Sequence, residues 1–389
     1  LRRQRQMCIR DRNQGDQQVN ARLRLADGSE QDCSAVYLAG CDGARSAVRK
    51  ALGIGFPGGT YQQVFFVADV QASGPAINGE LHVDLDEADF LAVFPLAGSG
   101  RVRLIGTVRD ERAQHPEDLR FEDISTRAIE HMKLQVEQVN WFSTYRVHHR
   151  VAQQFRRHRA FLLGDAAHVH SPAGGQGMNT GIGDAINLAW KLASVLHGKA
   201  GDELLESYEI ERKAFAERLV ATTDQVFNFV TADGRLANLL RTRLAPVLLS
   251  RLTALGKARS FLFRTVSQIG LNYRLMPLSF GSAGHVHGGD RMPWVHDLEG
   301  DNFVPLANPC WQVQVYGLAS KELVGWCAAR HIPLQVFAWS PTHEAAGLAR
   351  NAVYLLRPDS YVALAEASSS TAALERYFTE RSLRPGLTK

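Results

Sequence analysis

The chain has 389 residues, 45% of them hydrophobic, and its 44 basic and 40 acidic residues give a formal charge of +4. This length can bury large cores in about two domains, and the small charge excess, without a basic patch interleaved with aromatics, argues against a nucleic-acid partner. The longest apolar runs fall far short of the roughly 18 to 20 residues that cross a membrane, and no signal-like apolar segment follows the basic N-terminus, so we expect neither membrane insertion nor export.

Cysteine usage points to a reducing compartment. The chain contains five cysteines, an odd number, and none stands in Cys-x-x-Cys spacing. This pattern argues against a zinc site and a disulfide framework, and it favours a cytoplasmic location. The cysteines are Cys8, Cys33, Cys41, Cys310 and Cys327.

The N-terminal region predicts two strands that lead into an Asp-Gly turn and a basic helix. Strand patterns cover Val19 to Leu25 and Cys33 to Leu38, and a helical stretch begins at Ser46. The turn between them is a candidate ligand-binding element, although a turn followed by a solvated basic helix face would show the same pattern. The candidate residues are Asp42, Gly43, Arg45 and Arg49.

A block of strand patterns follows and predicts a sheet. The strand-like runs are Val64 to Val70, Leu81 to Leu85, Phe90 to Leu96 and Val102 to Val108. A helix is predicted next, because a helical period places four apolar residues on one face: Ile129, Met132, Val136 and Val139. Trp141 to Val151 leads the chain back towards the first domain. Some residues of this block could line a substrate pocket, although aromatics in sheets more often form core. These candidates are Phe90, Phe94, Pro95 and Tyr145.

The most informative stretch joins a buried strand, a carboxylate and a glycine-rich loop to a helix start. Ala160 to Leu163 is typical of a buried parallel strand, and Gly164-Asp165 ends it at the edge where α/β folds bind ligands. The loop from Pro172 to Gly177 has little side-chain bulk, so the positive end of the next helix would face a flat or anionic ligand. That helix is indicated by apolar residues at Ile186, Ala189, Trp190 and Ala193. The candidate ligand-binding residues are Gly164, Asp165, Pro172, Gly175, Gln176, Gly177, Met178 and Asn179. Taken alone, Asp165 could simply cap the loop.

The C-terminal half begins with helix formers and then changes pattern. Glu203 to Leu275 is rich in helix formers, and its leucine face indicates core or a dimer contact in preference to a membrane-surface helix. That face holds Leu236, Leu239, Leu240, Leu244 and Leu248. After a Gly- and His-rich linker from Phe280 to Arg291, the order becomes strand, helix, strand and a strand pair, which is thioredoxin-like. These elements are expected over Gln312 to Tyr316, Ser320 to Ala329, Leu334 to Trp339, Ala352 to Arg357 and Tyr361 to Leu364. The missing Cys-x-x-Cys favours a structural or dimer-supporting role for this part.

Two motifs give the chain a strong resemblance to the flavin-dependent aromatic monooxygenases, the para-hydroxybenzoate hydroxylase-like or group A family. Tyr37 to Arg49 resembles the Asp-Gly motif of that family, and Gly164-Asp165 resembles its Gly-Asp motif. The likeness continues through Tyr208 to Arg212 and Arg357 to Ala363. The resemblance implies that the Asp-Gly motif serves FAD and NAD(P)H, and that the Gly-Asp motif serves the ribityl chain of FAD.

The resemblance also implies a reaction. NAD(P)H would reduce FAD, O2 would form an FAD C4a-hydroperoxide, and its distal oxygen would hydroxylate a phenolic or other small aromatic molecule. Backbone N–H groups of Gly177, Met178 and Asn179 would stabilise the anionic reduced flavin. No catalytic base can be named from the sequence. A non-oxygenating FAD-dependent oxidoreductase shares both motifs, and an inactive fragment is the non-enzymatic alternative.

The fold class expected is α/β, with an incomplete Rossmann-like FAD-binding domain, an inserted sheet substrate domain and a C-terminal thioredoxin-like domain. We expect the FAD domain over 14–60 and 151–283, the substrate domain over 61–150 and the thioredoxin-like domain over 284–389, with a possible homodimer. The family's G-x-G-x-x-G unit is missing upstream of the Asp-Gly motif. The match at Gly53 to Gly58 follows a helical stretch and is rejected.

Residues 1–13 fit neither a strand nor a helix period and resemble translated adapter DNA, so we expect a non-native segment, a truncated gene and weak FAD retention. Histidines at positions 148, 149, 168, 170, 285 and 287 invite a metal interpretation. No carboxylate or thiolate stands at ligand spacing, so we expect no metal site.

Overall fold

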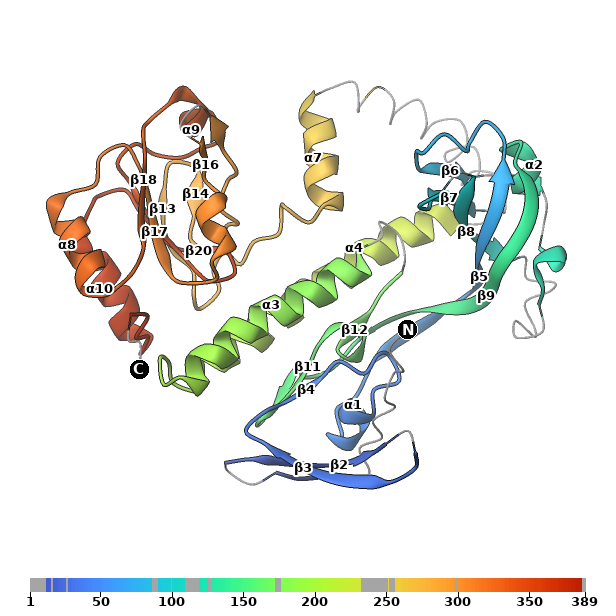
Figure 1. The fold of residues 1–389 in the computed structure, drawn as a ribbon, viewed down its shortest axis with the longest axis horizontal. Coiled ribbons are helices and arrows are strands. Elements are labelled where there is room, and N and C mark those ends of the chain that lie inside the picture. The colour runs from blue at the N-terminus through green and yellow to red at the C-terminus, as the bar shows by residue number, and fades with distance from the viewer. Residues whose placement is uncertain are drawn as a thin grey trace.

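A computed structural model describes residues 12–14, 17–25, 27–85, 90–98, 100–108, 119–124, 127–171, 176–231, 251, 256–297 and 300–386. Two larger sheets, each of six strands, lie at opposite sides of a pair of long helices, and two three-stranded sheets lie below them in the view of Figure 1. The predicted leucine face from Leu236 to Leu248 and most of the expected non-native segment lie outside the described residues.

The first unit is built around two short parallel strands. β4 (Leu38–Gly40) pairs with β11 (Ala160–Leu162), whose three residues are fully buried, and β10 (Arg156–Arg157) extends the sheet. The helix α1 (Ala47–Ala51) packs Val48 into the same core. The apolar run therefore forms the buried parallel strand that the sequence predicts, and the Gly-Asp motif follows directly at its carboxyl end.

A separate three-stranded sheet precedes this unit. It contains β1 (Arg12–Gln14), β2 (Val19–Arg24) and β3 (Glu30–Ala35). The prediction of one strand from Cys33 to Leu38 was wrong, because β3 pairs with β2 whereas β4 pairs with β11. The extended segment is interrupted at Val36 and Tyr37, where the chain passes from one sheet to the other.

The inserted sheet has the order β12-β9-β5-β8-β7-β6. Its strands are β5 (Gly58–Ser73), β6 (His82–Leu85), β7 (Phe90–Pro95), β8 (Arg101–Val108), β9 (Gln135–Val151) and β12 (His168–Val169). The long strands β5 and β9 pair from Gly58 opposite Arg150 to Ser73 opposite Gln135, so they connect the sheet to the first unit. The rejected glycine match at Gly53 to Gly58 lies between α1 and β5, not between a strand and a helix.

The predicted helix through Val136 and Val139 was wrong. The helix α2 is short (Arg127–His131), after the 3₁₀ turn η3 (Phe121–Asp123), and the chain enters β9 at Gln135. Both valines instead pair with β5 and pack against the core beneath the sheet. Valine packs well on a pleated surface, and the ladder with β5 outweighs the local helical period.

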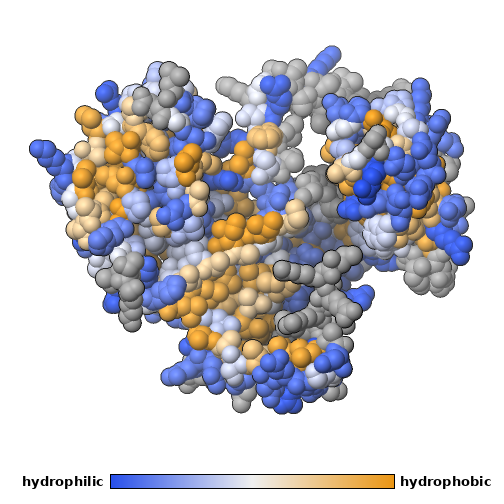
Figure 2. Space-filling model, viewed as in Figure 1, coloured by the Kyte–Doolittle hydropathy of each residue, from blue (hydrophilic) through white to orange (hydrophobic). Residues whose placement is uncertain are grey.

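Three helices continue the chain: α3 (Gly177–Leu196), α4 (Glu203–Thr231) and α7 (Gly256–Val266). Among the four residues expected on the apolar face of α3, Trp190 is buried, whereas Ile186 is 52% exposed. The buried face instead carries Asp184, Asn187 and Lys191, because these side chains pair with α4. Figure 2 shows the exposed apolar surface of this helix, which includes Met178, Ile182, Ile186 and Leu196.

The C-terminal sheet has the order β14-β13-β20-β19-β17-β18. Its strands are β13 (Phe280–Ala283), β14 (Val286–His287), β17 (Gln312–Tyr316), β18 (Leu334–Phe337), β19 (Val353–Leu356) and β20 (Val362–Glu366). Helices α8 (Lys321–Ala329), α9 (Pro341–Ala345) and α10 (Thr371–Glu380) alternate with them, and β15 (His296–Asp297), β16 (Gly300–Asp301) and η6 (Val304–Ala307) lie before β17. The expected linker from Phe280 to Arg291 was wrong, because β13 pairs with β20 and adds to the sheet.

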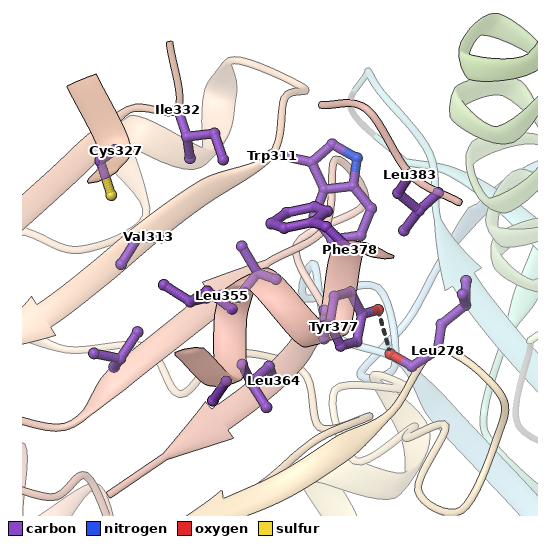
Figure 3. Packing of buried hydrophobic residues seen from close by; sticks show 14 of the residues in the cluster. Leu278, Trp311, Val313, Cys327, Ile332, Leu355, Leu364, Tyr377, Phe378 and Leu383 are labelled. Carbon is purple, nitrogen blue, oxygen red and sulfur yellow. Dashed lines mark hydrogen bonds between the residues drawn. The ribbon is translucent and has the colours of Figure 1, made fainter. Parts of the chain in front are cut away.

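Aromatic residues fill the core of this unit. Trp311 lies 5.3 Å from Phe378, ring centroid to centroid, and Tyr377 donates a hydrogen bond of 2.8 Å to the carbonyl oxygen of Leu278 (Figure 3). Cys327 lies in the same cluster, where burial raises the pKa of its thiol to about 11. Its thiolate population at neutral pH is therefore small.

A buried charge network fixes the C-terminal unit to α3 and α4. Arg357 donates two hydrogen bonds to Glu211, of 2.6 and 3.0 Å, and also pairs with Asp359. Lys191 lies 2.8 Å from the same Glu211 carboxylate. Trp190 donates to Asp359, so the network joins residues up to 169 positions apart in the chain. Within this network Arg357, Glu211, Lys191 and Trp190 are buried. The C-terminal unit is consequently held by ion pairs as well as by apolar contact.

Candidate functional site

The Asp-Gly turn is organised around the carboxylate of Asp42. This carboxylate accepts hydrogen bonds from the backbone N–H of Ala47 at 2.6 Å and of Val48 at 3.1 Å, and from the hydroxyl of Ser46 at 2.5 Å. Gly43 adopts φ +79°, a conformation that favours glycine. Asp42 therefore satisfies the free N–H groups at the start of α1 and fixes the turn.

Arg49 joins the two motifs. Its side chain is 5% exposed, and it donates one hydrogen bond of 2.7 Å to the carbonyl oxygen of Ala166 and another of 2.7 Å to that of Ala44. The guanidinium also lies 3.7 Å from the ring centroid of Phe56. Since Ala166 belongs to the Gly-Asp loop, Arg49 holds this loop against the Asp-Gly turn. Arg45, one turn earlier, is exposed.

The Gly-Asp loop is a short 3₁₀ turn, η4 (Gly164–Ala166), at the carboxyl end of β11. Gly164 has φ +56°, and a Cβ built on Gly181 would lie only 3.3 Å from the Cα of Gly164. The loop therefore lies against the backbone of α3, in a space that admits little more than glycine. Asp165 projects from this loop and is exposed, as expected for a residue that contacts a ligand.

A buried aspartate that the sequence analysis missed supports the loop. Asp184 accepts a hydrogen bond of 2.9 Å from the backbone N–H of Gly164, and its carboxylate lies 2.8 Å from Nε2 of His168 and 2.6 Å from Nε of Arg212. Burial alone would raise the pKa of Asp184, but His168 and Arg212 outweigh it and hold the pKa below its ordinary value. Arg212 also donates to Tyr273. Two features of the sequence could have pointed to this pair. Asp184 is the lone acid in the segment that forms α3, and Arg212 ends the Tyr208 to Arg212 motif, to which the sequence analysis assigned no role.

The first turn of α3 lies beside this loop. The side chain of Gln176, the N-cap residue, donates to the carbonyl oxygen of Thr265 at 3.0 Å and makes no capping hydrogen bond to the helix. Gly177, Met178 and Asn179 are exposed. A 20-residue helix thus presents an uncapped positive end next to Asp165. Pro172 and Gly175, also predicted at this site, lie outside the described residues.

Two of the four predicted substrate residues come together. Phe90 and Tyr145 belong to one apolar cluster with Phe65, whose ring centroid lies 6.4 Å from that of Phe90 and 5.8 Å from that of Tyr145. This aromatic face is the side of the inserted sheet opposite its main core. Phe94 is half-buried further along β7 and Pro95 is exposed at its end, and neither belongs to the cluster.

The aromatic face and the segment after the Gly-Asp loop meet at α4. Tyr61, in the same aromatic cluster, donates a hydrogen bond to Asp224 on α4, and burial together with Asp224 raises the pKa of its phenol. At the preceding residue of α4, the carbonyl oxygen of Thr223 accepts a hydrogen bond of 3.5 Å from Ser171, which follows β12. Sequence patterns contain no local signal for the pairing of Tyr61 with Asp224, because the two residues are 163 positions apart.

Other classes of site find no support in the described part of the chain. Within it, no group of three or more His, Cys, Asp or Glu side chains is arranged to hold a metal ion. None of the helices described there is long and apolar enough to cross a membrane. The four cysteines that can be placed, Cys33, Cys41, Cys310 and Cys327, are free thiols.

Comparison with known proteins identifies a family. Residues 3–223 match the family described as FAD binding domain. Pentachlorophenol 4-monooxygenase of Sphingobium chlorophenolicum is 34% identical over 72% of this chain and 51% of its own length. The 6-methylpretetramide 4-monooxygenase of Streptomyces rimosus is 35% identical over 70% of this chain and 49% of its own length. The chain thus spans about half the length of these curated relatives.

Solved structures agree with this assignment. The OxyS anhydrotetracycline hydroxylase from Streptomyces rimosus superposes with a TM-score of 0.71 at 26% identity, over 98% of this chain and 75% of the other. CabE, an aromatic hydroxylase from angucycline biosynthesis, gives 0.71 at 27% identity over 95% and 75%. Common descent therefore explains the two motifs and their arrangement around β4, β11 and α3. The chain belongs to the FAD-binding domain family.

Proposed function

We propose that this protein is an FAD-dependent monooxygenase that uses NAD(P)H and O2 to hydroxylate a phenolic small molecule. The observation that carries the proposal is the junction at α4, where Ser171, in the segment after the Gly-Asp loop, and Tyr61, in the aromatic face, bond to the adjacent residues Thr223 and Asp224. FAD, when bound, accepts a hydride from NAD(P)H and activates O2 for transfer to an electron-rich aromatic carbon. The residues of the chain orient the reactants and exclude water.

The Gly-Asp loop fits FAD. Asp165 offers an exposed carboxylate for the hydroxyls of the ribityl chain, and the uncapped end of α3 offers N–H groups of Gly177, Met178 and Asn179 for negative charge on the reduced flavin. Pro172, Gly175 and Gln176 would complete this loop. Gly164 contributes by its close approach to α3, which holds the loop that carries Asp165 against the helix.

Basic groups near the Asp-Gly turn support a nicotinamide donor. Burial lowers the pKa of His148, and the positive charges of Arg150, His149 and Arg45 lower it further, so these groups lie close together. Thr60 lies 2.7 Å from the ring of His148 and 3.5 Å from Arg150. We assign Arg45 to the phosphates of NAD(P)H. Asp42, Gly43 and Arg49 act by fixing the turn and by holding it against the Gly-Asp loop.

The substrate class follows from the aromatic face and from the names of the relatives. Phe90 and Tyr145 are proposed to contact an aromatic ring, with Phe94 and Pro95 at the distal end of the pocket. Hydroxylation is expected ortho or para to a phenolic oxygen, because a phenolate is richest in electrons there. The relatives named for pentachlorophenol and 6-methylpretetramide both act on aromatic compounds.

The test uses the protein reconstituted with FAD. NAD(P)H and a panel of phenols, chlorinated and polycyclic members included, are incubated under labelled O2. One labelled oxygen atom in the product, with NAD(P)H consumed, supports the monooxygenase. NAD(P)H consumption with all label in peroxide or water across the panel would favour the non-oxygenating oxidoreductase, and failure to retain FAD would favour an inactive fragment.

Asp165→Ala is expected to weaken FAD binding in this protein. Loss of one charged hydrogen-bond acceptor costs about 1.5 to 3 kcal/mol, or roughly 10-fold to 100-fold in affinity. The side chain is exposed, so folding should be unaffected. Flavin fluorescence titration measures the dissociation constant, and Glu137→Ala, an exposed acid on β9, is the matched control. An unchanged constant in the Asp165 variant would reduce this residue to a loop cap.

The C-terminal unit is inferred to be thioredoxin-like. Its order of strand, helix, strand, helix, two strands and helix, with β17 between β18 and β19, supports this inference. The raised pKa of Cys327 argues for a structural role instead of thiol chemistry. A homodimer and a cytoplasmic location stay predictions from the sequence.

A further inference from the structure

His170 carries a buried ring nitrogen at the junction of the site. It follows β12, and its Nδ1 lies 2.7 Å from the carbonyl oxygen of Ser171. A carbonyl only accepts hydrogen bonds, so Nδ1 carries the hydrogen, and in the neutral ring Nε2 has the lone pair. Nε2 is buried and has no hydrogen-bond partner among the residues that the structure describes. A lone pair held in this way is oriented to accept a proton.

This nitrogen lies beside the first turn of α3. A Cβ built on Gly177 would lie 3.7 Å from Nε2 of His170, so the ring points at the first turn of α3. The adjacent Ser171 is bonded to Thr223, and the next residue of α4 is Asp224, the acceptor of the Tyr61 hydroxyl. A substrate bound between the Gly-Asp loop and the aromatic face would therefore present its phenol to His170.

The charges around His170 suit a group that is neutral at rest and cationic after proton transfer. Burial lowers the pKa of His170, and the positive charge of His168 adds to this. The hydrogen bond to Ser171 and the charges of Asp165 and Asp224 act in the opposite direction. The ring is consequently neutral near pH 7, and two carboxylates stabilise the imidazolium once it forms.

We propose that His170 is the base that takes the phenolic proton of the substrate, an inference that rests on the proposed function. The O–H bond of the phenol breaks and its electron pair remains on oxygen. The proton forms the new N–H bond at Nε2. The resulting phenolate is the electron-rich species that hydroxylation requires, and solvent removes the proton from His170 before the next turnover.

Two of the neighbouring candidates for a base are engaged elsewhere. Nε2 of His168 faces the carboxylate of Asp184, which only accepts, so this nitrogen carries a hydrogen. The hydroxyl of Tyr61 already donates to Asp224. His149 is the competing candidate: its Nδ1 is also buried without a hydrogen-bond partner among the described residues and lies 3.9 Å from Asp224. It lines a hollow of about 370 Å³ with Lys213 and Glu217, whereas Nε2 of His170 lies beside the first turn of α3.

The first experiment reads the proton directly, with 4-nitrophenol as the probe. Its phenolate absorbs in the visible, so the pH at which the bound probe ionises can be measured on the FAD-loaded complete protein without turnover. The wild-type protein should ionise bound 4-nitrophenol at a lower pH than water does. His170→Ala and His170→Gln should lose this shift, and His197→Ala, an exposed histidine at the far end of α3, should keep it.

The second experiment is the pH profile of hydroxylation. General-base catalysis contributes about 100-fold or more, so both His170 variants should hydroxylate a phenol about 100-fold more slowly below the pKa of that phenol. The rate should recover at higher pH, where the substrate ionises in solution, and added imidazole should rescue the alanine variant. A purely structural role would lower the rate at every pH.

Several results would overturn the assignment. These are a wild-type protein that does not shift the ionisation of 4-nitrophenol, His170 variants that keep the shift and the profile, or a loss of the shift in His149→Ala instead. The wild-type titration needs no variant to fold. If labelled O2 never enters a product, the proposed function fails, whereas the nitrophenol titration still decides the role of His170.

Discussion

Replacing Glu211 with glutamine is expected to lower the free energy of unfolding by about 3 to 5 kcal/mol, because removal of one partner leaves buried charges uncompensated. Glu211 is fully buried and is the shared acceptor of Arg357 and Lys191. Asn187 also donates to it at 2.7 Å. Glutamine has nearly the same shape, so the loss reports on charge and not on a cavity. Urea denaturation followed by circular dichroism measures it.

The same carboxylate predicts acid sensitivity. Burial alone would raise the pKa of Glu211, but Arg357 and Lys191 outweigh it and lower the pKa to about 2 from an ordinary 4.5. A depressed pKa contributes stability above about pH 4.5 that is lost as the pH falls towards 2, here about 3 kcal/mol. The glutamine variant should lack this part of the pH dependence.

Glu206→Gln is the matched control for Glu211, since Glu206 lies on the same helix and is exposed. Its effect should stay within about 0.5 kcal/mol. If Glu211→Gln unfolds within 1 kcal/mol of the wild-type protein, at an unchanged acid midpoint, the network does not hold the C-terminal unit in the way inferred from the contacts.

Asp184→Ala is expected to have a comparable effect on stability and a second effect on the Gly-Asp loop. Arg212 would lose its carboxylate while fully buried, which costs about 3 to 5 kcal/mol. The N–H of Gly164 and Nε2 of His168 would lose their acceptor as well. The loop that positions Asp165 is then no longer anchored to α3, so FAD affinity should fall together with stability.

Measuring both quantities separates the two effects. Thermal and urea unfolding of the protein without FAD give the stability loss, and fluorescence titration below the transition gives the affinity. Glu206→Ala should change neither. An Asp184 variant that is destabilised but binds FAD as tightly as the wild-type protein would show that the loop holds its shape without the buried aspartate.

Local chemistry made part of the site readable from the sequence. The Asp-Gly turn needs φ +79° at Gly43 and a carboxylate to cap α1, and the Gly-Asp loop needs φ +56° at Gly164 at the end of a buried strand. Such requirements act within a few residues, so they leave motifs. The apolar runs of β11, β19 and β20 are predictable for the same reason, since burial on both faces of a strand demands continuous apolar sequence.

Longer-range pairing explains the errors. Val136 and Val139 fit a helical period, but the ladder with β5 places them in β9. The polar positions of α3 look solvent-exposed by composition, yet Asp184 and Lys191 are buried because their partners Arg212 and Glu211 lie on α4. A charged side chain can be buried only where an oppositely charged partner lies beside it in the fold. A hydropathy pattern does not show which residues become such partners.

The sequence by itself determined that the chain contains the two motifs, the buried strand β11 that leads into the second of them and the family to which they point, because each depends on neighbouring residues. Only the tertiary structure decided which residues surround the site. Tyr61 and Asp224 meet across 163 positions, and Arg357 reaches Glu211 across 146. The lone pair of His170 became visible only when its neighbours were in place. These contacts arise from strand register and helix packing, which the whole chain sets together.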